Sequence, residues 1–273
     1  KSQAPRRAPI SSGVKTATQR FELPAPSVAV RNLTELARYG HLCTTMSGMH
    51  HRRAGFPFGT LVDFAVDGAG HPVFCLSPLS IHSRNLLEDP RASMVVQMPG
   101  WTGLDNARVT IFGEIHQLSP ELQDPACDIF FAKHSSERTE RWLSGNFLYF
   151  RMDRIVDIYF VGGFGTVQWI DPAEYLNSPP DAVVLDSPTR TLQMLGDEFG
   201  AGVLEFISPV VLKPGQSISE LVFISIDANG VDVRVRVGPE FHVERVNFGR
   251  KVNSAAEAVE ALTQVLAAHK QKS

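Results

Sequence analysis

The sequence has little cysteine, no long apolar run and no excess of positive charge. Its three cysteines, Cys43, Cys75 and Cys127, lie far apart without Cys-x-x-Cys spacing, which indicates buried free thiols in a reducing compartment. No apolar run approaches the roughly 18 residues needed to cross a bilayer, so we expect no membrane span. The net charge of −3 does not imply nucleic-acid binding. The missing Gly-x-Gly-x-x-Gly fingerprint argues only against an integral nicotinamide site.

Acidic residues are also absent from the first 21 positions, which hold five basic residues among several Ser, Thr and Ala. This composition is typical of a disordered leader or of the remains of an organelle transit peptide. A truncated expression fragment could begin with the same composition. We therefore assign residues 1–25 to a leader rather than to a folded domain.

From residue 26 to 177 the hydrophobic pattern predicts a helix followed by antiparallel strands. The helix has Ser27 as its N-cap and Gly40 as its stop. One helix, near 125–134, interrupts the strands, and Asp67-Gly-Ala-Gly70 is typical of a tight hairpin turn. An antiparallel barrel fits this order, because closure removes the exposed edges of an open sheet. The expected strands are 41–47, 58–66, 71–76, 92–98, 107–117, 147–152, 155–161 and 166–170.

A second domain is predicted over residues 178–273. Asn177-Ser-Pro-Pro180 is typical of a linker, and it sets the boundary. Ser254 and Glu257 form a capping box at the start of the last helix. The chain is thus predicted to be an α+β protein, with a barrel followed by a small α+β domain. The helices expected in this domain are 189–199, 202–207 and 254–269, and the strands are 221–226, 231–237 and 241–248.

Residues 77–97 carry more polar side chains than a fold requires. Leu79, Leu86 and Leu87 are expected to face a core, and Asp89 with the proline after it ends a short helix. The first turn of a helix has unpaired N–H groups and the positive end of the dipole, so polar residues there predict a site for a phosphate or carboxylate. The polar residues of this helix are His82, Ser83, Arg84 and Asn85.

Six segments occur in an order that resembles the pyridoxamine-phosphate-oxidase-like split barrel and, within it, the HugZ/HutZ haem-utilisation branch. The tail, which runs from Ile226 to Arg234 and is followed by a helix, is similar to the small domain that follows the barrel in this branch and in its chloroplast relatives. The likeness covers residues 27–270 and implies a split antiparallel barrel. The six segments are Phe58-Gly-Thr-Leu-Val-Asp-Phe64, Ser77-Pro-Leu-Ser-Ile-His-Ser-Arg-Asn-Leu86, Asp89-Pro-Arg-Ala-Ser93, Ala107-Arg-Val-Thr-Ile-Phe-Gly113, Asn146-Phe-Leu-Tyr-Phe-Arg151 and Gly162-Gly-Phe-Gly165.

This resemblance implies a homodimer with ligand sites at the subunit interface, where flavin-binding relatives hold FMN and the haem branch holds haem. Arg84 lies at about the place of the basic residue that contacts the flavin phosphate, and in the haem branch the same region faces the macrocycle. Arg151 matches the arginine on the distal side of the haem, where a charged donor stabilises developing negative charge.

The haem iron needs an axial ligand, for which His51 and His82 are the candidates among nine histidines. His50, Arg52 and Arg53, in the loop between the first two strands, are expected to contact haem or its propionates. Each of these residues could instead have a purely structural role. The basic loop could simply be solvated, and His82 could cap its helix. Arg84 could pair with Glu88, and Arg151 could form a salt bridge at an interface.

The resemblance therefore implies a dimeric haem-binding protein that degrades haem with oxygen. Haem would be both cofactor and substrate, and an external donor would supply electrons. An FMN-binding oxidoreductase and a non-catalytic haem carrier or regulator of tetrapyrrole metabolism are the alternatives. The acid-free leader and the plastid relatives favour the chloroplast, although the cysteines fit a cytoplasmic protein equally well.

Overall fold

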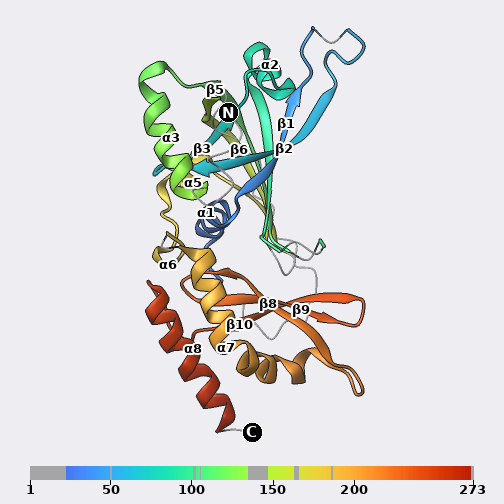
Figure 1. Cartoon of the computed structure of the whole chain (residues 1–273), viewed down its shortest axis with the longest axis vertical. Helices are drawn as coiled ribbons and strands as arrows, with labels where there is room; N and C mark the ends of the chain where they lie inside the picture. Colours follow the sequence, from blue (N-terminus) through green and yellow to red (C-terminus); the bar gives the residue numbers. More distant parts are fainter. Residues whose placement is uncertain are drawn as a thin grey trace, which may run out of the picture.

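A closed antiparallel barrel and a separate three-stranded sheet form the framework of the molecule (Figure 1). The computed structural model describes residues 23–49, 51–100, 103–104, 106–134, 147–162, 166–185 and 187–271. His50, the first 22 residues and part of the glycine-rich segment at 162–165 lie outside these ranges. The predicted α+β class, with an N-terminal antiparallel barrel, is confirmed.

The barrel closes because one short strand pairs on both of its sides. The strand order is β3-β2-β1-β4-β5-β6-β7, and an additional β3–β6 ladder joins the ends of the first six strands. Asp67 to Gly70 form the predicted turn between β2 and β3, where the Asp67 carboxylate accepts from three backbone N–H groups. The strands are β1 (Tyr39–Thr45), β2 (Pro57–Val66), β3 (Pro72–Leu76), β4 (Arg91–Gln97), β5 (Arg108–Gln117), β6 (Leu148–Gly162) and β7 (Thr166–Ile170).

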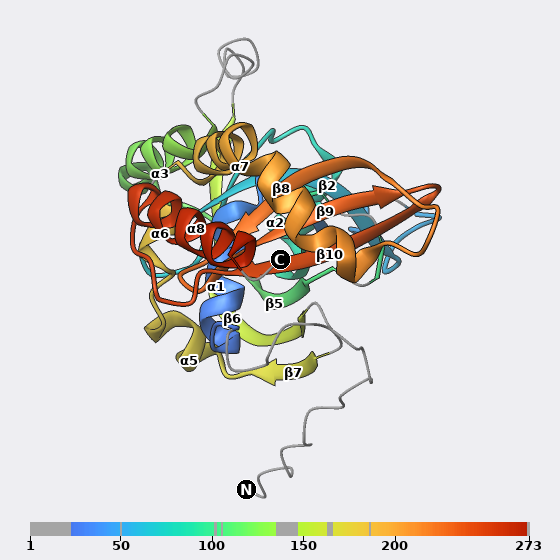
Figure 2. The same cartoon turned by 90° about the horizontal axis from the view of Figure 1, so that it is seen from below.

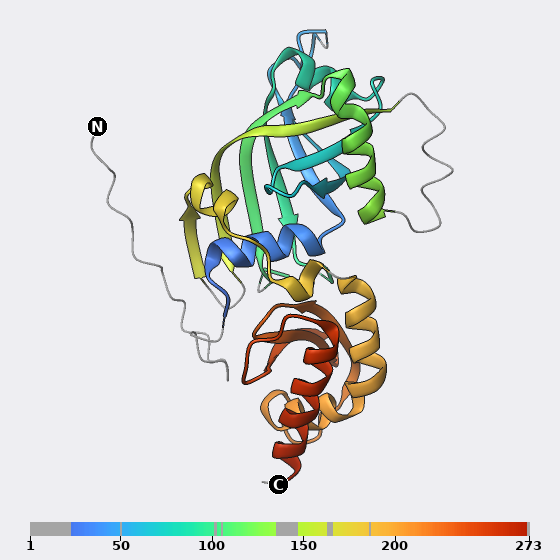
Figure 3. The same ribbon diagram turned by 90° about the vertical axis from the view of Figure 1, so that its left-hand side faces the viewer.

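Among the described residues, the helices that accompany the barrel are α1 (Pro26–Leu36), α2 (Ile81–Glu88), α3 (Pro120–His134) and α5 (Pro172–Asn177). α1 crosses the barrel end that faces the smaller sheet (Figure 3). Its Val30 and Leu33 pack into the barrel core, whereas Leu36 joins the core of the smaller sheet. One helix therefore contributes to both hydrophobic cores.

The C-terminal sheet has the order β10-β9-β8, and α7 and α8 cover it (Figure 2). Leu195, Phe199, Val203 and Ile207 recur every four residues along α7 and pack into this core. In α8, the Ser254 hydroxyl accepts from the Glu257 N–H, as predicted. The elements are α6 (Ala182–Leu185), α7 (Pro188–Val211), β8 (Ile218–Ile226), β9 (Gly230–Val237), β10 (Glu240–Asn247) and α8 (Ala255–Lys270).

Several of the predicted element boundaries were wrong. The helices expected at 189–199 and 202–207 are the single helix α7, because its buried stripe continues past Gly200 and Ala201, which separate them. The strands expected at 147–152 and 155–161 are the single strand β6, which continues through irregular pairing with β5 near Gly113. α1 begins after Ala25 and ends at Leu36, so Ser27 lies inside the helix and Gly40 lies in β1.

The state of the three cysteines and the lengths of the described helices agree with the predictions from composition, except that the cysteines are less buried than expected. Cys43, Cys75 and Cys127 are free, but they are half-buried rather than fully buried. Burial raises the pKa of Cys75 to about 11, so its thiol stays protonated at neutral pH. Among the described helices, none is long and apolar enough to span a bilayer.

A buried ionic cluster holds β9 and β10 together. Arg245 has a side chain that is 1% exposed and donates to Asp227 at 2.7 Å and to Asp232 at 3.1 Å. Burial raises the pKa of Asp227, and the guanidinium of Arg245 opposes that change. Loss of the arginine would leave two carboxylates without their counter-charge.

We predict that Arg245→Ala lowers the free energy of unfolding by about 3–5 kcal/mol, because it leaves buried charges unpaired. The control is Arg250→Ala, which removes an exposed ion pair with Glu260 and should cost about 0–1 kcal/mol. Urea-induced unfolding measures both variants. Equal losses in the two variants would contradict the prediction.

Candidate functional site

The predicted site region is the barrel end formed by α2 and the β1–β2 turn, which lies away from the C-terminal sheet (Figure 1). α2 begins after Ser80, whose hydroxyl accepts from the Ser83 N–H at 3.4 Å and lies 2.7 Å from the Ser83 hydroxyl. It ends at Glu88, before the predicted Asp89-Pro90 stop.

Two connections fasten the β1–β2 turn to α2. The Ser47 N–H donates to Asn85 Oδ1 at 3.0 Å, and the amide of Asn85 donates to Thr44 Oγ1 at 2.9 Å. The Gly48 N–H donates to Glu88 Oε1 at 2.9 Å. These bonds bring the basic turn and the polar helix to the same end of the barrel.

The predicted site residues divide into accessible and buried groups. His51, Arg52 and Arg53 are exposed in the turn, and His82 and Arg84 are half-buried in α2. Ser83 and Asn85 are fully buried and use their polar atoms inside the protein. Ligand contact by Ser83 and Asn85 stays a prediction, and their bonds show what holds the helix in place. His50 lies outside the described residues.

The leucines of this segment were only partly predicted. Leu86 is buried, as expected, but Leu79 is 76% exposed and Leu87 is 65% exposed. The turn presents Met49 and Phe56 to solvent as well. Leu79 precedes α2, and Leu87 lies on the side of this short helix that does not meet the barrel. This end therefore combines exposed apolar side chains with basic ones.

His82 has an environment that favours its neutral form. Burial lowers its pKa from the ordinary value of 6.5. At neutral pH the ring therefore keeps a lone pair on one nitrogen, which is the form that binds a metal. The predicted Arg84–Glu88 ion pair is not among the contacts of the described residues, and Glu88 binds the Gly48 N–H instead.

Arg151 lies apart from α2, on the outer face of β6. It pairs in register with Val73, whereas Leu148 pairs with Leu76 at the end of β3 that leads into α2. Its Nε donates to Asp153 at 2.9 Å, and its Nη1 lies 3.7 Å from Asp67. Both of these ion pairs lie within one chain, so a salt bridge of Arg151 across an interface stays a prediction.

The Asp67 carboxylate is well suited to hold this arginine. Burial alone would raise its pKa, but hydrogen bonds from the His71 side chain and from the His71 and Ala69 backbone lower it below the ordinary value. The carboxylate therefore remains ionised at neutral pH and attracts the Arg151 guanidinium.

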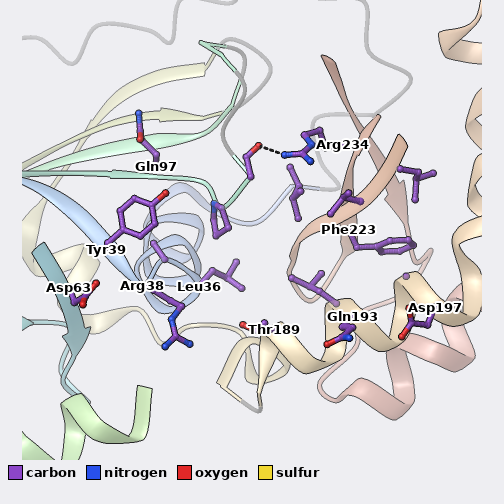
Figure 4. A pocket seen from close by; sticks show the side chains of 18 residues that line it. Leu36, Arg38, Tyr39, Asp63, Gln97, Thr189, Gln193, Asp197, Phe223 and Arg234 are labelled. Atoms are coloured by element: carbon purple, nitrogen blue, oxygen red, sulfur yellow. Dashed lines mark hydrogen bonds between the residues drawn. The ribbon is translucent and has the colours of Figure 1, made fainter. Parts of the chain in front are cut away.

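A cavity of about 730 Å³ lies elsewhere, between the barrel and the C-terminal sheet (Figure 4). None of the predicted site residues lines it. Its walls come from α1, β1, β2, β4, α7, β8 and β9, so no local motif marked them in the sequence. Within the described ranges, no group of three or more His, Cys, Asp or Glu side chains is placed to hold a metal ion.

Comparisons with known proteins agree with this fold. "Non-canonical heme oxygenase HOZ, chloroplastic" from Arabidopsis thaliana is 23% identical over 235 residues, which cover 85% of this chain and 71% of that protein. "Glutamyl-tRNA reductase-binding protein, chloroplastic" from the same plant is 28% identical over 238 residues, which cover 84% of this chain and 66% of that protein.

Among solved structures, a heme binding protein from Mycobacterium smegmatis matches with a TM-score of 0.58 at 22% identity. The match covers 91% of this chain and 99% of that structure, and at this identity it shows a shared fold. The predicted resemblance to a split-barrel family with chloroplast relatives is confirmed. The family model described as "CREG, beta-barrel" matches residues 22–177, more than half of the sequence, and the chain belongs to this CREG β-barrel family.

Proposed function

We propose that this protein binds haem at the end of the barrel formed by α2 and the β1–β2 turn, and that it degrades haem with oxygen. A chloroplast relative bears the name of a non-canonical heme oxygenase, which supports the proposal. Haem is the substrate, oxygen is the oxidant, and an external donor supplies the electrons.

The mixed surface of this end is the observation that carries the proposal. A haem has an apolar macrocycle and propionate carboxylates at one edge, so it needs apolar contacts beside cations. Leu87 is exposed on α2, Leu79 is exposed just before this helix, and Met49 and Phe56 are exposed in the turn. The basic residues of the same two elements are His51, Arg52, Arg53, His82 and Arg84. Together they match the chemistry of the ligand.

Each residue has a proposed role. His82 is the proposed axial ligand because burial keeps its imidazole neutral, and His51 in the exposed turn is the second candidate. Arg52, Arg53 and Arg84 bind the propionates, and His50 remains a predicted contact. Ser83 and Asn85 hold α2 and the turn in place through their internal hydrogen bonds. The bound haem supplies the redox chemistry.

Arg151 is the proposed distal donor, and it requires a second subunit. Its separation from α2 along the β3–β6 ladder argues against a site made by one chain alone. In a homodimer, the β6 face of one protomer meets the α2 end of the other, so both contribute to one site. Asp153 and Asp67 hold the guanidinium in place through their ion pairs.

An exposed aromatic patch on β5, β6 and β7 supports the dimer. Trp169 is 61% exposed, and its ring lies 5.0 Å from Tyr159 and 6.1 Å from Phe112, measured between ring centroids. Aromatic side chains gathered on an outer sheet face are typical of protein–protein contacts. We place the dimer interface here, and we also propose residence in the chloroplast, as in the plant relatives.

Hemin titration tests the ligand. We predict that the protein gives a Soret band that saturates at one haem per subunit, and that His82→Ala raises the dissociation constant by about tenfold or more. His242→Ala, which changes a surface histidine of β10, should leave the constant unchanged. Loss of the band in His51→Ala alone would identify His51, in the turn, as the axial ligand instead of His82. No saturable band in the wild type would overturn the haem proposal.

Decay of the bound haem tests the activity. With ascorbate in air, the wild type should lose the Soret band and release iron. Arg151→Gln should bind haem normally but lose the band about a hundredfold more slowly, as when a charge-stabilising donor is removed. Arg154→Gln, which changes an exposed arginine paired with Glu114, is the control. A stable Soret band in the wild type would instead identify a haem carrier.

The molecular mass in solution tests the proposed dimer interface. Light scattering should give twice the chain mass of 30.0 kDa for the wild type. Trp169→Glu should give the single-chain mass, because a carboxylate in an apolar interface loses its hydration without gaining a partner. Leu185→Glu changes an equally exposed apolar residue of α6 and should remain dimeric. A monomeric wild type would contradict the two-chain site.

A further inference from the structure

The cavity between the barrel and the C-terminal sheet has no part in the proposed haem site. It lies between the barrel and the C-terminal sheet and has a volume of about 730 Å³, which is typical of small-molecule sites at domain junctions (Figure 4). Its residues come from the α1–β1 connection, the strands beside it, α7 and β8.

Two stretches of backbone form the long walls of this cavity. Residues 221–224 of β8 line it consecutively, although successive side chains of a strand point to opposite faces. A run of this kind means that the edge of the strand faces the cavity, and β8 is an edge strand of its sheet. Residues 36–39, which include the extended residue Ala37, line the opposite wall. The cavity is therefore a slot between two chain segments.

One end of the slot is closed by contacts between the two sheets. Arg234 of β9 donates to the Gly100 carbonyl at 3.3 Å and forms an ion pair with Glu220 (Figure 4). Gly100 has a φ of +75°, and a Cβ there would lie 2.8 Å from Ile224. Only glycine permits this close approach without strain. The shape of the slot is thus set by packing.

The charges of the walls select against an ionised ligand. The lining holds two arginines, Arg38 and Arg234, and two aspartates, Asp63 and Asp197, and Arg234 forms an ion pair with Glu220 beside the slot. Most of the remaining lining is aliphatic or aromatic. Within the described residues, the Tyr39 hydroxyl and the Gln97 amide have no side-chain hydrogen-bond partner, and both lie at the barrel side of the slot (Figure 4).

We propose that this slot is a second ligand site, which binds a neutral and largely apolar small molecule. The apolar body of the ligand lies along β8 and α7, and its hydrogen-bonding groups meet Tyr39 and Gln97. This chemistry differs from that of haem, which carries propionate charges and is assigned to the opposite end of the barrel. The two sites are therefore independent in position and in ligand class.

A matched pair of glycines on α7 tests the proposal. Gly196 lines the slot, and a Cβ there would make an ordinary contact with Phe223 at 3.6 Å. Gly200 lies one turn further along, is not part of the lining, and a Cβ there meets nothing within 4 Å. Substitution of either glycine raises the helix propensity, so the variants differ mainly in whether the new side chain enters the slot.

The probe is Nile red, a neutral apolar dye whose fluorescence rises in apolar surroundings. We expect Gly196→Leu to raise its dissociation constant by about tenfold or more, because the new side chain occupies the slot. Gly196→Ala should have a smaller effect in the same direction. Gly200→Leu and His82→Ala should bind the dye as the wild type does. Circular dichroism shows whether each variant is folded.

Three results would overturn the proposal. The first is absence of saturable Nile red binding to the wild type. The second is unchanged binding in folded Gly196→Leu, or equal weakening in Gly200→Leu. The third is preferential binding of the anionic dye anilinonaphthalene sulfonate in a manner sensitive to Gly196, which would reverse the ligand class. None of these outcomes depends on haem binding, so either proposal can fail while the other stands.

Discussion

The pairing of β3 with both β2 and β6 is the constraint on which the rest of the molecule depends. β3 is only five residues long, yet without its second ladder to β6 the strands would form an open sheet with two free edges. Closure also fixes the two ends of the barrel. The chain leaves β3 into α2 at one end, and the Asp67–Gly70 turn enters β3 at the other. Tyr175 donates to Gly70 there, so α5 is fixed to the same turn.

Much of the fold could be predicted because its signals are local. Alternation of apolar residues marked the strands, Asp67 with its glycines marked a turn, and Ser254 marked a helix start. The errors arose where distant contacts override local signals. Two helices were predicted at 189–199 and 202–207, but packing of α7 on the C-terminal sheet keeps the helix continuous through this region. Leu87 is apolar, yet it faces solvent because α2 meets the barrel on one side only.

The candidate site was predictable in its location more than in the roles of its residues. The polar helix and the basic turn were identified from sequence, and Asn85 and Glu88 do bring them to one end of the barrel. The burial of Ser83 could not be read from its neighbours, because it depends on how α2 meets β1. The slot beside β8 was missed altogether, since its walls are separated by more than a hundred residues and acquire a common surface only after folding.

The helix α1 has a consequence for cooperativity. Val30 and Leu33 belong to the barrel core, and Leu36 belongs to the core of the C-terminal sheet. Asn32 exchanges two hydrogen bonds with Asp181, which in turn accepts from the Ala228 N–H. Melting of either sheet would therefore expose apolar surface and unpaired polar groups in the other. We therefore expect a cut between the two sheets to lower the stability of both.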